Sequence, residues 1–228
     1  EIDIERHTLT IHGTGGVLSV PPEGVIDVGN AGAVLRLLMG ICAVLPEPVT
    51  FVTPYPESLG RRPNADLLDA LEQLGVCVES ADGMLPITLR GGLERGVRGG
   101  KVRVSGKKSS QYISSLLFLA PLLPEGLDIE IVDGLASASF VDLTIDILRQ
   151  AGITIIEEQS HQHYIVAGKQ TYRAGEYHIP GDYPSVAALL AAAAVTDGEV
   201  TLANLPPGDV GGEAILSAFS EMGMQITR

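Results

Sequence analysis

The chain has 228 residues, 45% of them apolar, and a formal net charge of −13 from 28 acidic and 15 basic side chains. This length is sufficient for one large domain or two small ones with a substantial core. The negative charge opposes binding to nucleic acid or to an anionic membrane surface, because both are polyanions. No apolar run reaches the roughly 18 residues of a membrane-spanning helix. A small anionic ligand in a local basic pocket remains compatible with this composition.

The N-terminal residues alternate between polar and apolar types, and residues 2–4 and 8–11 predict a hairpin. They have neither the pattern of a signal peptide nor that of a transit peptide. Because the chain does not begin with Met, we expect it to be a piece of a longer protein. Cys42 and Cys77 lie in apolar segments without metal-ligand spacing, which predicts two buried, reduced thiols and a cytoplasmic location.

Helix and strand patterns then alternate along the chain. The first unit contains a helix, a strand, a second helix and a hairpin: residues 30–44, 49–52, 63–74, and 76–79 with 85–89. Asn30 is the predicted N-cap of the first helix, and Gly75 ends the second. The dipeptide Asp82-Gly83 predicts the turn of the hairpin.

The same order of elements returns twice, at a spacing of about 75–80 residues, which is typical of an internal repeat. The second unit comprises residues 109–120, 127–132, 140–150, and 153–158 with 163–166; the third comprises residues 184–195, 199–203 and 212–222. We therefore predict an α/β (α+β) fold in which residues 1–228 form one globule of three units, at approximately 18–96, 97–175 and 176–228. The third unit lacks its hairpin, and we expect residues 1–17 to complete it, because each end would otherwise leave an unpaired strand edge.

Polar clusters mark the starts of the first helix in each unit: residues 29–32, 107–111 and 181–185. Helix N-termini present free N–H groups and a positive dipole end, which suit phosphate or carboxylate, although each cluster alone is also consistent with ordinary capping. Lys107 and Lys108 add positive charge to the second cluster. Arg61 and Arg62 precede another helix, where they oppose its dipole; they favour a carboxylate or phosphate contact, with a solvated pair as the alternative.

These motifs resemble those of the 5-enolpyruvylshikimate-3-phosphate synthase family, and they follow one another in the same order. The matching segments are Gly29-Asn30-Ala31-Gly32 with Arg36, residues 57–63, Ser109-Ser110-Gln111, Ser137 with residues 140–144, and residues 181–185. The resemblance implies an enolpyruvyl transferase-like fold of two globules, each with three βαβαββ units in a pseudo-threefold arrangement. In that family, residues 181–228 would begin the second globule.

The resemblance also implies an activity, namely enolpyruvyl transfer from phosphoenolpyruvate to the 5-hydroxyl of shikimate-3-phosphate, with no metal and no cofactor. This transferase reaction belongs to the shikimate pathway of aromatic amino-acid biosynthesis. The implied ligands of shikimate-3-phosphate are Ser109, Ser110, Gln111, Ser137 and Phe140; those of phosphoenolpyruvate are Gly32, Arg36, Arg62 and Gln111.

Several positions depart from the family pattern. Ala33 and Leu37 stand where many members have Thr and Pro, near the position of the inhibitor glyphosate, and Phe140 stands where many have Tyr. The N-terminal Lys-Ser segment and most of the second globule, which carries the proton-transfer residues, are missing. The general acid and base are therefore unknown, and we expect the isolated chain to bind shikimate-3-phosphate weakly without significant turnover.

Two other functions stay open. One is a non-catalytic structural scaffold, and the other is a UDP-N-acetylglucosamine enolpyruvyl transferase, which uses a reactive cysteine on a mobile loop; the apolar contexts of Cys42 and Cys77 differ from such a loop. His161 and His163 suggest either a metal pair or, with no third ligand nearby in the sequence, a solvated hairpin turn. The oligomeric state is not predicted.

Overall fold

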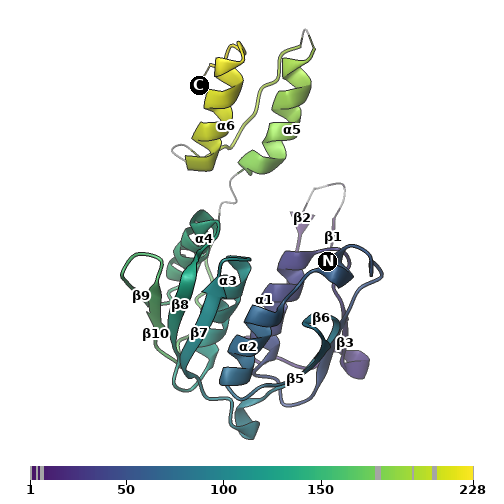
Figure 1. Ribbon diagram of the computed structural model, residues 1–228, viewed down its shortest axis with the longest axis vertical. Coiled ribbons are helices and arrows are strands. Elements are labelled where there is room, and N and C mark those ends of the chain that lie inside the picture. Colours follow the sequence, from purple (N-terminus) through teal and green to yellow (C-terminus); the bar gives the residue numbers. More distant parts are fainter. Residues whose placement is uncertain are drawn as a thin grey trace. The chain divides into compact units, whose positions relative to one another are not determined.

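The computed structural model describes residues 2–3, 5, 8–177, 181–196, 198–206 and 210–227 (Figure 1). The chain divides into two compact units, Glu1–Gly175 and Glu176–Arg228. No helix in the described part of the chain is long and apolar enough to cross a membrane.

The first complete repeat lies in the N-terminal unit and contains six elements. They are β3 (Val25–Asp27), α1 (Gly32–Cys42), β4 (Val49–Val52), α2 (Ala65–Gln73), β5 (Cys77–Ala81) and β6 (Met84–Arg90). The sheet order is β3-β4-β6-β5, with β3 and β4 parallel and the other pairs antiparallel. Short 3₁₀ turns at Pro22–Gly24, Leu59–Arg61 and Leu93–Arg95 connect or flank these elements.

The second repeat has the same order. Its elements are β7 (Gly100–Gly106), α3 (Gln111–Leu119), β8 (Leu127–Leu135), α4 (Ala138–Gln150), β9 (Ile155–Glu158) and β10 (His163–Val166), with a 3₁₀ turn at Ala120–Leu122. The sheet order β7-β8-β10-β9 again begins with a parallel pair. The mixed α/β class and the βαβαββ order of these two repeats are therefore confirmed.

The first strand of each repeat, β3 or β7, was missing from the pattern read along the residues. Strand β3 has only three residues, too few for an alternating pattern to stand out. Strand β7 does alternate, with Val102 and Val104 buried between exposed or half-buried neighbours, but glycines bound it at both ends. A strand of this length leaves a detectable alternating pattern, so β7 is predictable from the sequence.

Helices α1 and α3 pack against each other and join the two repeats (Figure 1). Their apolar faces, which include Leu35, Met39, Ile113 and Leu116, are fully buried, and each such side chain contributes about 1.5–3 kcal/mol through burial. The helices approach so closely that a Cβ on Gly40 would lie 2.4 Å from Ser115 Oγ. This contact brings the beginnings of the two repeats together.

The start of α1 corrects one prediction, because Asn30 is not the N-cap. Ala31 occupies the cap position without a side-chain hydrogen bond, and Asn30 is exposed one residue earlier. The preceding turn is held instead by Asp27, whose Oδ1 accepts a hydrogen bond of 2.8 Å from the Gly29 N–H. Helix α1 therefore begins after this turn, at Gly32.

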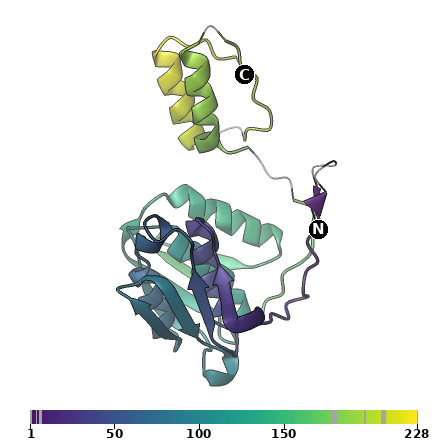
Figure 2. The ribbon, with the colours of Figure 1, turned by 90° about the vertical axis from the view of Figure 1, so that its right-hand side faces the viewer.

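The C-terminal unit contains α5 (Tyr183–Ala194) and α6 (Val210–Glu221), which lie side by side (Figures 1 and 2). Asp182 caps α5 by accepting a 2.9 Å hydrogen bond from the Ser185 N–H. The predicted strand at residues 199–203 is wrong, since these residues have no ladder partner among the described residues of the unit. A strand exists only through hydrogen bonds to a neighbour, which an alternating sequence cannot supply by itself.

At the N-terminus, β1 (Ile2–Asp3) pairs with β2 (Thr8–Leu9) in an antiparallel hairpin, as predicted. The completion of a third repeat by residues 1–17, the single globule over residues 1–228 and the pseudo-threefold arrangement stay predictions.

Candidate functional site

The predicted site residues all follow the carboxyl ends of the parallel strand pairs. In the first repeat, Gly32 comes after β3 and Arg62 comes after β4. In the second, β7 and β8 end in register at Gly106 and Leu135, so the segments that leave them begin side by side. Ser109–Gln111 and Ser137 lie in these segments. This edge is where open α/β sheets bind ligands.

Arg36 on α1 is the centre of a buried polar network that joins the two repeats. Its side chain is only 9% exposed. Nη1 donates to Gln111 Oε1 at 2.9 Å and to Ser109 Oγ at 3.4 Å. Nε donates to Asn64 Oδ1 at 3.1 Å, and Nη2 donates to the Pro63 carbonyl at 3.4 Å. The Tyr112 ring lies beneath the guanidinium, 5.3 Å from Cζ, at a cation–π distance.

The oxygen acceptors around Arg36 are all neutral. In the part of the chain that the structure describes, no carboxylate contacts this guanidinium. Burial lowers the pKa of Arg36, Tyr112 raises it, and the neighbouring charge of Arg62 lowers it. An arginine remains charged despite such shifts. A buried cation without a counter-ion is costly, and an incoming phosphate or carboxylate would relieve that cost.

Arg62 and Gly32 complete the positively charged side of the site. A Cβ placed on Gly32 would lie 3.4 Å from Arg62 Nη1 and 3.8 Å from Arg36 Nη1. The two guanidinium groups therefore approach the same small volume beside Gly32. The adjacent Arg61 behaves differently, because it pairs with Glu57, four residues earlier in the chain.

The N-terminus of α3 supplies neutral polar groups. Ser110 is buried at the cap position, and its hydroxyl makes no capping hydrogen bond. Ser109 Oγ accepts a 3.3 Å hydrogen bond from the Gln111 N–H as well as the contact from Arg36. Lys108 Nζ pairs with the Asp66 carboxylate at 3.0 Å, which offsets the positive charge predicted for this cluster. Arg36 and Arg62 contribute the positive charge beside Gly32.

Ser137 and Phe140 lie at the start of α4. Ser137 occupies the cap position in a left-handed conformation with φ +53°, which costs about 1–2 kcal/mol for a residue other than glycine. Phe140 is 50% exposed. One turn further, the Thr144 hydroxyl contacts the Phe140 carbonyl and Ser114 Oγ, both at 2.8 Å, which ties α4 to α3. The structure therefore places Ser137 and Phe140 at the same end of the helix pair as Gln111.

Two residues of the network were not identified from the sequence. Asn64 is fully buried and binds Arg36, and the Tyr112 hydroxyl donates a 2.8 Å hydrogen bond to the Pro63 carbonyl. The position of Asn64, a polar residue directly before an apolar helix, can be recognised in the sequence. The same pattern is typical of any N-cap, so it does not indicate a contact with Arg36. Tyr112 follows the Ser-Ser-Gln motif and offered no separate signal.

The predictions for the cysteines and histidines have different outcomes. Cys42 is buried, and burial raises its pKa to about 11, whereas Cys77 is exposed on strand β5, contrary to expectation. His161 lies in the turn between β9 and β10, as predicted, and its ring contacts Asp142 at 2.8 Å. His163 is the first residue of β10, and its ring lies between Asp128 at 2.6 Å and Glu158 at 3.0 Å. No group of three or more His, Cys, Asp or Glu side chains in the described ranges is arranged to hold a metal ion.

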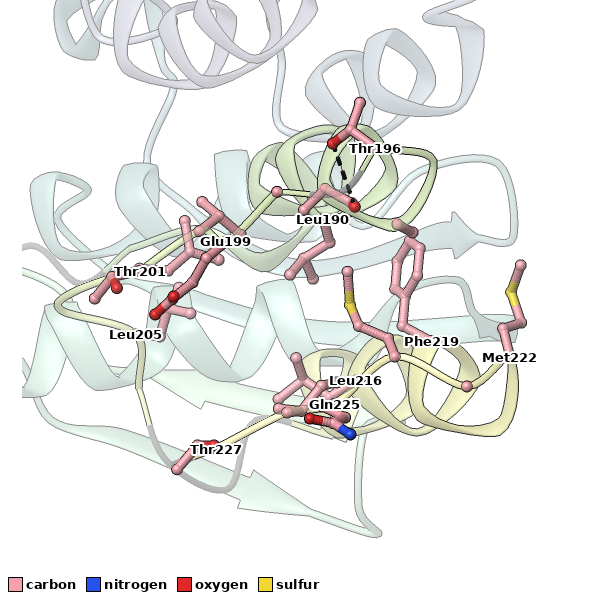
Figure 3. A pocket seen from close by; sticks show the side chains of 18 of the residues that line it. Leu190, Thr196, Glu199, Thr201, Leu205, Leu216, Phe219, Met222, Gln225 and Thr227 are labelled. Atoms are coloured by element: carbon pink, nitrogen blue, oxygen red, sulfur yellow. Dashed lines mark hydrogen bonds between the residues drawn. The ribbon is translucent and has the colours of Figure 1, made fainter.

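The C-terminal unit contains a hollow of about 1140 Å³ between α5, α6 and the extended segments beside them (Figure 3). Leu190, Leu216 and Phe219 point into it, together with the acidic side chain of Glu199. Its described lining residues include Glu213 but no Lys, Arg or His. The predicted basic site residues Arg36 and Arg62 lie within the N-terminal unit.

Comparisons with known proteins agree over the whole chain. The family model described as EPSP synthase (3-phosphoshikimate 1-carboxyvinyltransferase) matches residues 1–228. A curated relative of that enzyme name from Deinococcus radiodurans is 47% identical over 210 residues, which cover 91% of this chain and 47% of the relative. Another, from Methanosarcina acetivorans, is 41% identical over 227 residues, covering 98% of this chain and 51% of the relative.

A solved EPSP synthase structure from Acinetobacter baumannii has a TM-score of 0.67 and 23% identity, and it covers 89% of this chain and 43% of that chain. At this identity the likeness concerns the fold alone. The chain spans about half the length of the curated relatives it matches.

Proposed function

The chain belongs to the EPSP synthase family, and we propose that it supplies part of the substrate site of a 3-phosphoshikimate 1-carboxyvinyltransferase. This transferase of the shikimate pathway joins the enolpyruvyl group of phosphoenolpyruvate to the 5-hydroxyl of shikimate-3-phosphate and releases phosphate. Both substrates are small anions, and the proposed site takes no metal or cofactor.

The observation that carries the proposal is the pair of arginines beside Gly32. Arg36 is buried with neutral partners, and Arg62 approaches the same volume. Paired guanidinium groups bind carboxylate and phosphate oxygens through several parallel hydrogen bonds. We assign phosphoenolpyruvate to this volume, with Gly32 leaving room for it.

The neutral groups at the starts of α3 and α4 would hold shikimate-3-phosphate. The hydroxyls of Ser109, Ser110 and Ser137 can donate to its phosphate, and the N-terminus of α3 adds a positive dipole end. The Phe140 ring offers an exposed apolar surface to the carbon ring of the substrate. Gln111 would lie between the two ligands, because its amide oxygen already contacts Arg36.

Such a site acts by placing the 5-hydroxyl against the enol carbon, and positioning of this kind contributes about 7–11 kcal/mol to catalysis. The arginines and the helix N-terminus stabilise the charge on phosphate and carboxylate groups. The proposal includes no general acid or base from this chain. We therefore expect weak binding of the substrates and no significant turnover by the isolated chain.

The same proposal places the protein in the cytoplasm, where thiols stay reduced. Cys42 and Cys77 are both free thiols, which fits such a compartment.

Titration of the chain with shikimate-3-phosphate and phosphoenolpyruvate, followed by NMR shifts and calorimetry, tests the proposal. We expect Arg62→Gln to weaken phosphoenolpyruvate binding about tenfold or more, because a charge-assisted contact is lost. Arg61→Gln is the matched control and should leave the affinity unchanged, since Arg61 already pairs with Glu57. Ser110→Ala and Gln111→Ala should weaken binding of shikimate-3-phosphate.

Absence of binding in the wild-type chain, or equal losses in the two arginine variants, would favour a non-catalytic scaffold. Robust phosphate release by the chain with both substrates present would contradict the expected inactivity.

A further inference from the structure

We propose that Asn64 is a positioning residue whose neutral amide orients Arg36 toward an anion without cancelling its charge. This inference rests on the proposed function, because it assigns a cause to the anion affinity of that same site.

Asn64 holds three segments of the first repeat together from a fully buried position. Its Oδ1 accepts the 3.1 Å hydrogen bond from Arg36 Nε. Its Nδ2 donates to the Arg62 carbonyl at 2.9 Å and to the Gly83 carbonyl at 3.1 Å. Both ends of the amide are therefore engaged, and one side chain fixes the guanidinium of Arg36 and the backbone of Arg62 at once.

The turn of the β5–β6 hairpin forms the support for this amide. Gly83 has φ +71°, and a Cβ there would lie 2.9 Å from the Ala65 nitrogen, so the turn sits directly against the start of α2. The Gly83 carbonyl accepts from the Asn64 backbone N–H at 3.0 Å as well as from the side chain. This double contact leaves the Asn64 side chain little freedom to rotate away from Arg36.

The choice of amide rather than carboxylate has an electrostatic consequence. Buried arginines are ordinarily paired with a carboxylate, which orients the guanidinium and neutralises it. At Asn64 the acceptor oxygen orients Nε equally well, yet the unit positive charge remains. The charge is available in surroundings where water screens it poorly, so it attracts an anion strongly.

The remaining contacts of Arg36 direct this charge toward Gly32. Nη2 faces the Pro63 carbonyl and Nη1 faces Gln111 and Ser109. Nη1 is also the Arg36 atom nearest the Cβ position of Gly32, where Arg62 Nη1 and Leu59 approach too. With Nε fixed by Asn64, the plane of the guanidinium is set for the anion before it arrives.

The experiment uses the wild-type chain, Asn64→Asp, Asn64→Leu and the control Gln170→Leu. Gln170 is a matched control because its amide also makes three hydrogen bonds, in this case all to backbone groups, two to Thr154 and one to Ala167. Hydrogen exchange at the arginine Nε–H resonances reports the orientation of Arg36, and titration with phosphoenolpyruvate reports the affinity.

In the wild type, we expect the Arg36 Nε–H to exchange at least about tenfold more slowly than that of the exposed Arg61. Asn64→Leu should abolish this protection and weaken phosphoenolpyruvate binding about tenfold or more. Asn64→Asp should keep the protection and still weaken binding to a similar extent, because the carboxylate neutralises Arg36. Gln170→Leu should change neither quantity.

If Asn64 merely stabilised the fold, Asn64→Asp would not weaken phosphoenolpyruvate binding while keeping the Arg36 Nε–H protected from exchange. Wild-type affinity in Asn64→Asp or in Asn64→Leu would overturn the inference. An unprotected Arg36 Nε–H in the wild type would also overturn it, and this measurement does not depend on the folding of any variant. A protected Nε–H in a wild-type chain that does not bind phosphoenolpyruvate would instead overturn the proposed function, and it would leave the orienting contact in place.

Discussion

The second helices of the two complete repeats have similar sequences but different surroundings. The segments at the ends of α2 and α4, Leu71-Glu72-Gln73-Leu74-Gly75 and Leu148-Arg149-Gln150-Ala151-Gly152, align with the same Leu, Gln and Gly. Helix α2 packs against β7 of the second repeat, and its Ala70 is fully buried. The matching residue of α4, Ile147, is 36% exposed although it is far more apolar.

The glutamines of this segment show the same contrast. The Gln73 side chain donates to the Arg103 carbonyl and accepts from the Arg103 N–H, both at 2.9 Å, so its amide pairs with edge strand β7 as a further strand would. Gln150 is exposed. The comparison teaches that the neighbour of a helix, and not its own sequence, decides which face is buried.

The largest effect on the free energy of unfolding should come from a charge placed on the buried face of α2. Ala70→Asp introduces a carboxylate at a fully buried position of α2, and we expect a loss of about 3–5 kcal/mol in the free energy of unfolding. Ile147→Asp is the matched change on α4 and should cost about 1 kcal/mol or less, because water already reaches that position. Urea denaturation of both variants measures the difference, and similar losses would show that the two faces are equally covered.

A smaller effect should follow from removal of the glutamine that pairs with β7. Gln73→Ala deletes two hydrogen bonds to Arg103, and we expect it to lower the free energy of unfolding by about 1–2 kcal/mol. Gln150→Ala should change this free energy by less than about 0.5 kcal/mol. Equal losses in the free energy of unfolding for Gln73→Ala and Gln150→Ala would contradict the contrast between α2 and α4.

The smallest effect concerns the outer faces of the two sheets. In the first repeat, Thr50 and Thr88 form a neutral pair at 2.9 Å, whereas the second repeat has His163 between two carboxylates. The hydrogen bond to Asp128 raises the pKa of His163 above its ordinary value of 6.5; burial opposes this rise, and the hydrogen bond to Glu158 adds to it. The stabilisation is therefore complete below about pH 6.5 and is lost as the pH rises through the higher pKa of the folded state.

His163→Gln should accordingly cost about 0.2–1 kcal/mol at pH 6, and less as the pH rises above 7. Urea denaturation over a pH series measures this difference, with Thr88→Val as the control, which removes the neutral pair and should give a loss that is independent of pH over the same range. A loss in His163→Gln that grows with pH would contradict the sign of the shift.

The two repeats also divide the candidate site between them. The first supplies the cationic groups of Arg36 and Arg62, and the second supplies the neutral groups of Ser109, Ser110 and Gln111. The contact between α1 and α3 joins the two sets, and the hydrogen bond from Arg36 to Gln111 bridges residues far apart in the sequence.

Much of the fold was accessible from the sequence, because its signals are local. Apolar spacing and glycine stops located α1 to α4, and the recurrence of one element order revealed the repeats. The same reasoning failed at residues 199–203, where an alternating pattern has no partner strand, and at Asn30, where the turn at Asp27 moves the helix start. The polar motifs likewise located the elements that carry the candidate site.

The sequence by itself thus determined the helices, the repeat and the polar segments that follow the strands, since capping and amphipathic spacing act between residues a few positions apart. Only the tertiary structure decided which partners the basic side chains have. Lys108 is neutralised by Asp66, Arg61 by Glu57, and Arg36 by no carboxylate within the described residues. These outcomes depend on which side chains the packing of α1 against α3, and of the hairpin turn against α2, brings within hydrogen-bond distance. Periodicity along one segment carries no information about that distance.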